Sequence, residues 1–237
     1  MRILAAIAIA ASLFAFSCAG DSTSTDGNVT VESSLANSTV SSFVKSSDRV
    51  QGGSIVDSIT VTRVRVLVSR MILHPDNNAD TTDSTNDKNI KLQPFLYMAD
   101  STGVRVVAST SVPNGTYEKI KWEIHRFSSS EAPSYAGDTV YRDFVTGDRY
   151  TSIIEGWLVR NGVRERFVYR SDATSNITIK FETSVTASDA TPLILSLMFD
   201  ARATFFKDGE ILDPADSKNE SKIDNNIKAA FRANKKR

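Results

Sequence analysis

An alternation of apolar and polar residues with a period of two runs through the chain from residue 54 onward, and it restricts the fold more than any other feature. Its longest stretch covers thirteen residues, with apolar side chains at every second position: Leu193, Leu195, Leu197, Phe199, Ala201, Ala203 and Phe205. Successive side chains of a β-strand point to opposite faces of its sheet. The pattern therefore predicts a long strand with one buried face.

The same period recurs in shorter segments that are bounded by turn residues. Residues 153–159 and 163–170 flank Asn161-Gly162, a pair that supports the positive φ angles of a type I′ turn, so they predict a hairpin. Ile120, Trp122 and Ile124 predict one buried face in the strand that follows the turn at residues 112–115.

About eight strands at this spacing, with no helices alternating between them, favour an all-β chain over a parallel α/β fold. We expect an antiparallel β-sandwich, immunoglobulin-like or transthyretin-like, over residues 54–237. The phase of the alternation changes near Thr62-Arg63, which predicts a bulge there.

The end of the chain changes to the helical period. Ser217 and Glu220 fit a capping box, in which the serine caps the helix and the glutamate reaches back. One amphipathic face follows, formed by Ile223, Ile227, Ala230 and Phe231. We therefore expect one C-terminal amphipathic helix that packs on the sheets.

The first eighteen residues have the layout of an export signal. Arg2 precedes an apolar run from Ile3 to Phe16, which is too short to cross a bilayer comfortably, so residues 1–17 are expected to be a signal peptide. Cys18, the single cysteine, lies where bacterial lipoproteins are cut and lipidated. We expect a lipid on Cys18 to hold the protein in the cell envelope, at the outer membrane; plain cleavage after Ala19 or Gly20 is the alternative.

Residues 18–53 differ in composition from the rest of the chain. Ser, Thr, Asp and Asn dominate, and the apolar residues are scattered singly. Such a segment buries too little surface to offset its ordering entropy, so we expect a flexible tether between the lipid and the domain. For the Val29-Thr30-Val31 patch, an additional edge strand is the alternative prediction.

Composition argues against several classes of function. The 28 basic and 28 acidic residues balance, and no basic stripe of the kind that binds nucleic acid is present. The chain has no G-x-S-x-G motif, and lipidation would remove its single thiol, so we do not expect an enzyme. His74 and His125 do not form a zinc-ligand pattern.

Two acidic segments are candidate metal sites. Asp76, Asn78, Asp80 and Asp87 follow the spacing of a calcium loop, although Thr81 stands where such a loop needs glycine. A solvated connection between strands is the favoured interpretation, so we expect no cofactor, with a bound calcium ion as the alternative. The second segment, Asp208, Glu210, Asp213 and Asp216, is already explained by turns that lead into the helix, with metal binding as the less favoured alternative.

Three tyrosines mark a candidate ligand-binding loop. Tyr135, Tyr141 and Tyr150 lie in the least regular stretch, residues 128–150. Binding residues are often carried on such loops, and aromatic rings stack on the apolar faces of sugars.

Several short motifs resemble those of a lipoprotein family. They include Gly115-Thr116-Tyr117, Glu123-Ile124-His125, Leu212-Asp213-Pro214 and Asn226-Ile227-Lys228. In this order they are similar to uncharacterised β-sandwich lipoproteins of Bacteroidetes-type bacteria. The resemblance implies a fold and an envelope location, and it implies no catalytic residues.

The sequence therefore favours a non-catalytic binding or assembly module for an envelope or extracellular protein, bound by edge-strand addition. A surface lipoprotein that binds a glycan or small ligand is the alternative. A metal-dependent hydrolase would need one of the acidic segments to hold an ion.

Overall fold

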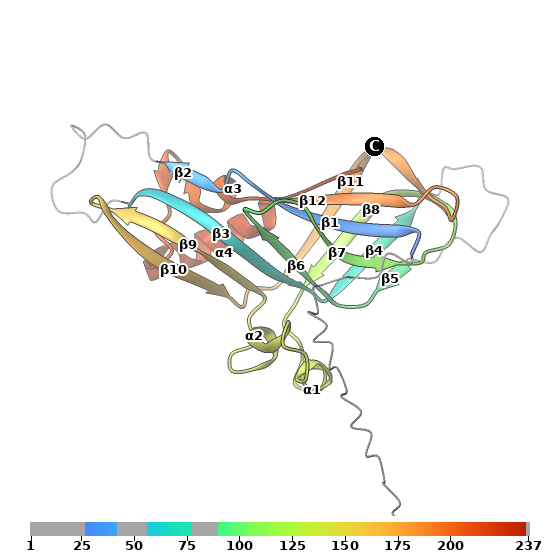
Figure 1. Ribbon diagram of the computed structural model, residues 1–237, viewed down its shortest axis with the longest axis horizontal. Helices are drawn as coiled ribbons and strands as arrows, with labels where there is room; N and C mark the ends of the chain where they lie inside the picture. The colour runs from blue at the N-terminus through green and yellow to red at the C-terminus, as the bar shows by residue number, and fades with distance from the viewer. Residues whose placement is uncertain (1–26, 42–55, 77–89, 236–237) are drawn as a thin grey trace, which may run out of the picture.

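The computed structural model describes residues 27–41, 56–76 and 90–235 (Figure 1). It is mostly β, with several sheets and one short C-terminal helix, as the sequence predicts. Figure 1 shows these elements arranged along one long axis, with two small helices, α1 and α2, beside the middle.

Three sheets contain most of the strands. Sheet A has the order β15-β12-β1-β7 and is formed by β15 (Phe231–Lys235), β12 (Leu193–Asp200), β1 (Val29–Ala36) and β7 (Arg105–Thr110). Sheet B has the order β10-β9-β3-β2 and is formed by β10 (Val163–Ser171), β9 (Ser152–Arg160), β3 (Val56–Val68) and β2 (Thr39–Ser41), with β6 (Phe95–Asp100) also paired to β3. Sheet C has the order β11-β8-β4-β5 and is formed by β11 (Ser175–Ala187), β8 (Gly115–Ile124), β4 (Arg70–Pro75) and β5 (Ile90–Leu92).

The remaining elements are short. A small ribbon pairs β13 (Phe206–Lys207) with β14 (Glu210–Ile211). The helices are α1 (Ala132–Tyr135), α2 (Arg142–Val145), α3 (Ala201–Phe205) and α4 (Glu220–Ala229), with a 3₁₀ turn at Ser217–Asn219.

Strand β1 lies in the segment that was expected to be a tether, so that expectation is wrong for residues 29–41. It pairs in parallel with β12 and antiparallel with β7, which also makes sheet A mixed rather than wholly antiparallel. Val29 and Val31 are fully buried. The polar residues of β1 indicated a solvated segment, so the strand was not predicted. In the structure Ser33 is buried and its hydroxyl donates to the Met98 carbonyl, and the Ser34 carbonyl accepts from the Tyr97 hydroxyl at 2.6 Å. Residues 18–26 and 42–53 of the expected tether lie outside the described residues.

The long strand expected over residues 193–205 ends at Asp200. There the Asp200 carboxylate accepts hydrogen bonds from the backbone N–H groups of Arg202 and Ala203, which caps α3. Ala201 and Phe205 are both buried, as the alternation requires. Residues four apart also share one face of a helix, so this part of the pattern fits either structure.

The C-terminal helix is present, but it is shorter than expected. Ile223 and Ile227 are buried on its inner face, as predicted. Ser217 lies in the 3₁₀ turn, where the Asp216 carboxylate accepts from the Lys218 N–H at 3.0 Å in place of the expected capping box. Phe231 begins β15 rather than ending the helix, and β15 pairs antiparallel with β12.

Other local predictions are confirmed. The pairing of β3 with β9 shifts register between Val61 and Arg63, where the bulge was expected. The hairpin of β9 and β10 turns through Asn161 and Gly162, whose φ angles are 51° and 78°. The three residues predicted to share a buried face of β8 are buried: Ile120, Trp122 and Ile124.

One hydrophobic core runs through all three sheets. Its centre is Phe231, whose ring lies edge-on to three others, with centroid distances of 5.2 Å to Tyr97, 5.3 Å to Trp122 and 5.2 Å to Phe199. A second, smaller core lies under α1 and α2 and consists of Leu67, Leu96, Phe127, Ala132, Phe144 and Ile153.

The position of β1 in the core gives a stability prediction. We expect Val31→Ala to lower the free energy of unfolding by about 2 kcal/mol, because it removes two methyl groups from a filled site. Val163→Ala is the matched control, since Val163 is 60% exposed, and it should change stability by less than about 0.5 kcal/mol. Urea unfolding of the mature chain measures both. Equal, negligible effects would restore the interpretation of this segment as a tether.

Candidate functional site

The structure brings two of the three predicted tyrosines together as packing partners. Tyr135 stacks on Phe127 with ring centroids 4.3 Å apart, and Tyr141 lies 5.0 Å from Tyr135. The Tyr141 hydroxyl donates to the Pro94 carbonyl at 3.3 Å. Both tyrosines are partly buried and pack against the smaller core. A ligand-binding role for this loop stays a prediction.

Tyr150 makes different contacts from the other two. Its hydroxyl donates to the Asp148 carboxylate at 3.1 Å, and the Arg170 guanidinium lies 5.7 Å from its ring centroid. The hydrogen bond to Asp148 raises the pKa of the Tyr150 phenol. Its side chain also packs against the smaller core. The three tyrosines therefore do not form one flat, open platform.

The expected calcium loop lies mostly outside the described residues. Asn78, Asp80 and Asp87 belong to the undescribed range 77–89. Asp76 is described, and its carboxylate accepts a hydrogen bond from the Ser184 hydroxyl of β11. Within residues 27–41, 56–76 and 90–235, no group of three or more His, Cys, Asp or Glu side chains is placed to hold a metal ion.

The second acidic segment holds a turn and a helix start in position. Asp213 forms an ion pair with Arg160 of β9 at 2.6 Å, and its other carboxylate oxygen accepts from the Ala215 N–H at 2.9 Å. Asp208 has a φ angle of 54° and forms the turn between β13 and β14. These contacts give Asp208 and Asp213 structural roles in turns, which agrees with the interpretation of this segment as turns that lead into the helix.

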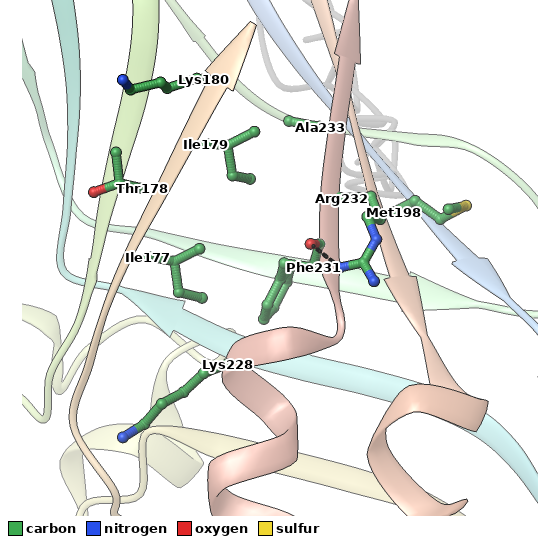
Figure 2. Close-up of a pocket in the computed structure, with 9 residues that line it drawn as sticks. All are labelled: Ile177, Thr178, Ile179, Lys180, Met198, Lys228, Phe231, Arg232 and Ala233. Carbon is green, nitrogen blue, oxygen red and sulfur yellow. Dashed lines mark hydrogen bonds between the residues drawn. The ribbon is translucent and has the colours of Figure 1, made fainter.

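A groove of about 650 Å³ lies where the edge of sheet A meets the edge of sheet C (Figure 2). Strand β15 is the last strand of sheet A and β11 is the last strand of sheet C, and the two lie side by side. In the described part of the chain, neither has a second strand neighbour. The groove is lined by Ile177, Thr178, Ile179, Lys180, Met198, Lys228, Phe231, Arg232 and Ala233.

The floor of this groove is apolar. Figure 2 shows Ile177, Ile179 and Phe231 directed into the space between the two strands. Ile177 and Phe231 are buried and Ile179 is half-buried. An apolar side chain that entered here would lose contact with water on most of its surface, which favours binding.

The rim is cationic. Lys180, Lys228 and Arg232 are all exposed, and no ion pair joins any of them to a carboxylate of the described residues. The Arg232 guanidinium donates to the carbonyls of Ala229 at 2.6 Å and Phe231 at 3.0 Å, the latter drawn in Figure 2. These bonds fix the guanidinium beside the start of β15.

This lining offers apolar and cationic contacts to a ligand. The described lining residues contain no carboxylate, histidine or cysteine, and Thr178 supplies their single hydroxyl. A hydroxyl needs an oriented base to become a nucleophile. The alternation of Ile177 with Ile179 was visible in the sequence, but the neighbouring wall was missed because Phe231 was assigned to a helix.

The burial of Tyr141 gives a prediction at alkaline pH. Desolvation, with smaller contributions from Tyr135 and Asp138, raises the pKa of the Tyr141 phenol to about 12. Its ordinary value is about 10, so its contribution to stability is complete below pH 10 and is lost as pH rises toward 12. Tyr141→Phe removes the ionisable phenol, and with it this pH-dependent loss of stability, and it also removes one hydrogen bond.

We therefore expect Tyr141→Phe to be less stable than the parent at pH 8 and the gap to narrow above pH 10. Urea midpoints at pH 8, 10 and 11 measure this trend. A gap that stays constant over this range would show that the phenol ionises as readily in the folded chain as in the unfolded one.

Comparisons with family models, with curated proteins and with solved structures each found no match. Among the described residues, no helix is long and apolar enough to cross a membrane.

Proposed function

We propose that this protein is a non-catalytic binding module of the bacterial cell envelope. Its ligand is an extended, acidic segment of an envelope or extracellular protein, which lies in the groove between β11 and β15. The observation that carries the proposal is the groove itself, an apolar floor with a cationic rim between two strand edges.

Strand edges supply the main-chain part of this recognition. An edge strand presents N–H and C=O groups that no neighbouring strand uses, and an extended peptide can pair with them. Its side chains then alternate between the groove and the solvent. Apolar side chains of the ligand fit against Ile177, Ile179 and Phe231, which lie at the floor.

Charge supplies the specificity. Lys180, Lys228 and Arg232 are the charged residues of the lining, so an acidic segment is favoured over a basic one. Complementary charge at the rim also speeds the encounter of the two partners more than it tightens the final complex.

The anchor belongs to the same proposal. A lipid on Cys18 would place the domain at the outer membrane, and ten residues, 19–28, separate Cys18 from the first residue of β1. Ten extended residues span at most about 35 Å, so the domain would lie close to the bilayer. The finer fold assignment, an immunoglobulin-like or transthyretin-like sandwich, is also proposed; it is supported by the single core that sheets A, B and C share.

Charge reversal at the rim tests the groove. Extended peptides selected from a displayed library on the purified mature chain should combine acidic and apolar residues. The double variant Lys180→Glu, Arg232→Glu should weaken their binding at least about tenfold, because it replaces attraction with repulsion at two points.

Lys222→Glu is the control for this experiment, since it reverses an exposed charge outside the groove, on α4, the helix that carries the lining residue Lys228. It should leave peptide binding unchanged. Selected peptides that bind the double variant as tightly as the parent would rule out the groove as their site.

Substitution of the cysteine tests the anchor separately. Cys18→Ser should prevent lipidation, move the protein from the membrane fraction to the soluble fraction of lysed cells and abolish labelling by a fatty-acid analogue. Peptide binding by the purified chain should not change. A Cys18→Ser protein that remains in the membrane fraction would contradict the lipid anchor.

A further inference from the structure

The outer face of sheet B carries an ordered set of polar and aromatic side chains that the groove does not use. Residues directly opposite one another on neighbouring strands share a face. One row across β10, β9, β3 and β2 consists of Arg166, Trp157, Thr60 and Thr39. The next row consists of Arg164, Val159, Ser58 and Ser41.

The alternate residues of the same strands face the core. Leu158, Ile59 and Val40 form the row between these two, and each is almost wholly buried. On that inner side, the Tyr169 hydroxyl donates to the Asp224 carboxylate of α4 at 2.7 Å. Helix α4 thus covers the inner face, and the two polar rows lie on the outer one.

Two arginines of this face are held in place. The Arg164 guanidinium lies 4.4 Å from the Trp157 ring centroid, a cation–π contact. Arg166 pairs with Glu155 at 3.0 Å. A guanidinium that is already positioned loses less conformational entropy when it binds a ligand.

The face has a surplus of positive charge, although the whole chain has none. Five arginines lie on this side of β3 and β10: Arg63, Arg65, Arg164, Arg166 and Arg170. Two carboxylates, Glu155 and Asp143, pair with members of this set, which leaves a surplus of three, five minus two. Asp100, opposite Arg63, has its own partner in Arg105 at 2.7 Å and leaves that surplus unchanged.

We propose that this face binds a polysaccharide whose sugars carry carboxylate groups, as uronic acids do. Guanidinium groups form paired hydrogen bonds with carboxylates, which places an acid group on Arg164, since Arg166 already pairs with Glu155. Trp157 offers an aromatic surface for the C–H groups of a sugar ring. The hydroxyls of Ser41 and Ser58 can donate to and accept from sugar hydroxyls. Those of Thr39 and Thr60 are hydrogen-bonded to each other at 3.4 Å and can still accept.

Other anionic polymers fit this face less well. Nucleic acid needs a longer basic stripe to neutralise its dense phosphates. An acidic peptide would use the free edge of β10 rather than the hydroxyl rows in the middle of the sheet. A neutral polysaccharide would leave the charge of Arg164 without a counterpart. The inference is independent of the groove, whose lining belongs to sheets A and C and to α4.

Affinity electrophoresis of the mature chain tests this inference, with polygalacturonate in the gel as the acidic probe and dextran as the neutral one. We expect polygalacturonate to retard the parent and dextran not to. Trp157→Ala and Arg164→Gln should each weaken retardation at least about tenfold, as residues at the centre of a binding surface do. Trp157→Phe should keep part of the retardation that Trp157→Ala loses, because phenylalanine still offers an aromatic ring.

Lys222→Gln is the charge control and should leave the retardation unchanged. Arg164→Gln decides the result if Trp157→Ala unfolds, because the Arg164 side chain is exposed. Dextran sulfate, an anionic polymer without carboxylate groups, is a third probe in the gel. It distinguishes recognition of a carboxylated sugar from attraction to any negative charge. No retardation by polygalacturonate would overturn the proposal. The proposal would also be overturned if polygalacturonate and dextran sulfate both retard the parent, and if Arg164→Gln and Lys222→Gln reduce that retardation equally.

Discussion

The fold depends on the ring of Phe231, because it touches one aromatic ring from each sheet. Tyr97 comes from β6 of sheet B, Trp122 from β8 of sheet C and Phe199 from β12 of sheet A. Edge-on aromatic pairs of this kind contribute about 0.5–1.5 kcal/mol each beyond the area they bury. Since Phe231 is also the first residue of β15, the same contacts fix the strand that forms one wall of the groove. Stability of the core and shape of the groove thus have a common origin.

Features that are decided locally could be predicted from the sequence, and features that depend on distant partners could not. The hairpin at Asn161-Gly162 and the bulge near Arg63 follow from turn chemistry and from the phase of one strand. Strand β1 was missed because its serines are buried with carbonyl partners on other strands. Helix α3 was read as a strand because Ala201 and Phe205 fit the period of either element.

The candidate sites follow the same division. The period of two shows which side chains of β11 point inward, but it cannot show that the edge of β11 lies beside β15. The tyrosines were expected on an open loop, whereas that loop has its own small core around Phe127 and Phe144. Trp157 did carry a signal, since it lies out of phase with Ile154 and Leu158, and the structure places it on the outer face of sheet B.

The path of β1 relates the proposed anchor to both proposed surfaces. Strand β1 leads from Val29, opposite Leu193, to Ala36, and the chain then enters β2 of sheet B at Thr39. A lipid on Cys18 would therefore hold the Val29 end nearest the bilayer. Strands β2, β9 and β10 of sheet B lie beyond the other end of β1, as Figure 1 shows, so the outer face that they help to form would be carried away from the membrane. A charged polymer outside the bilayer could reach that face without displacing the anchor. The groove borders the Phe199 end of β12, which pairs with Leu35, so it lies between the anchored end and sheet B.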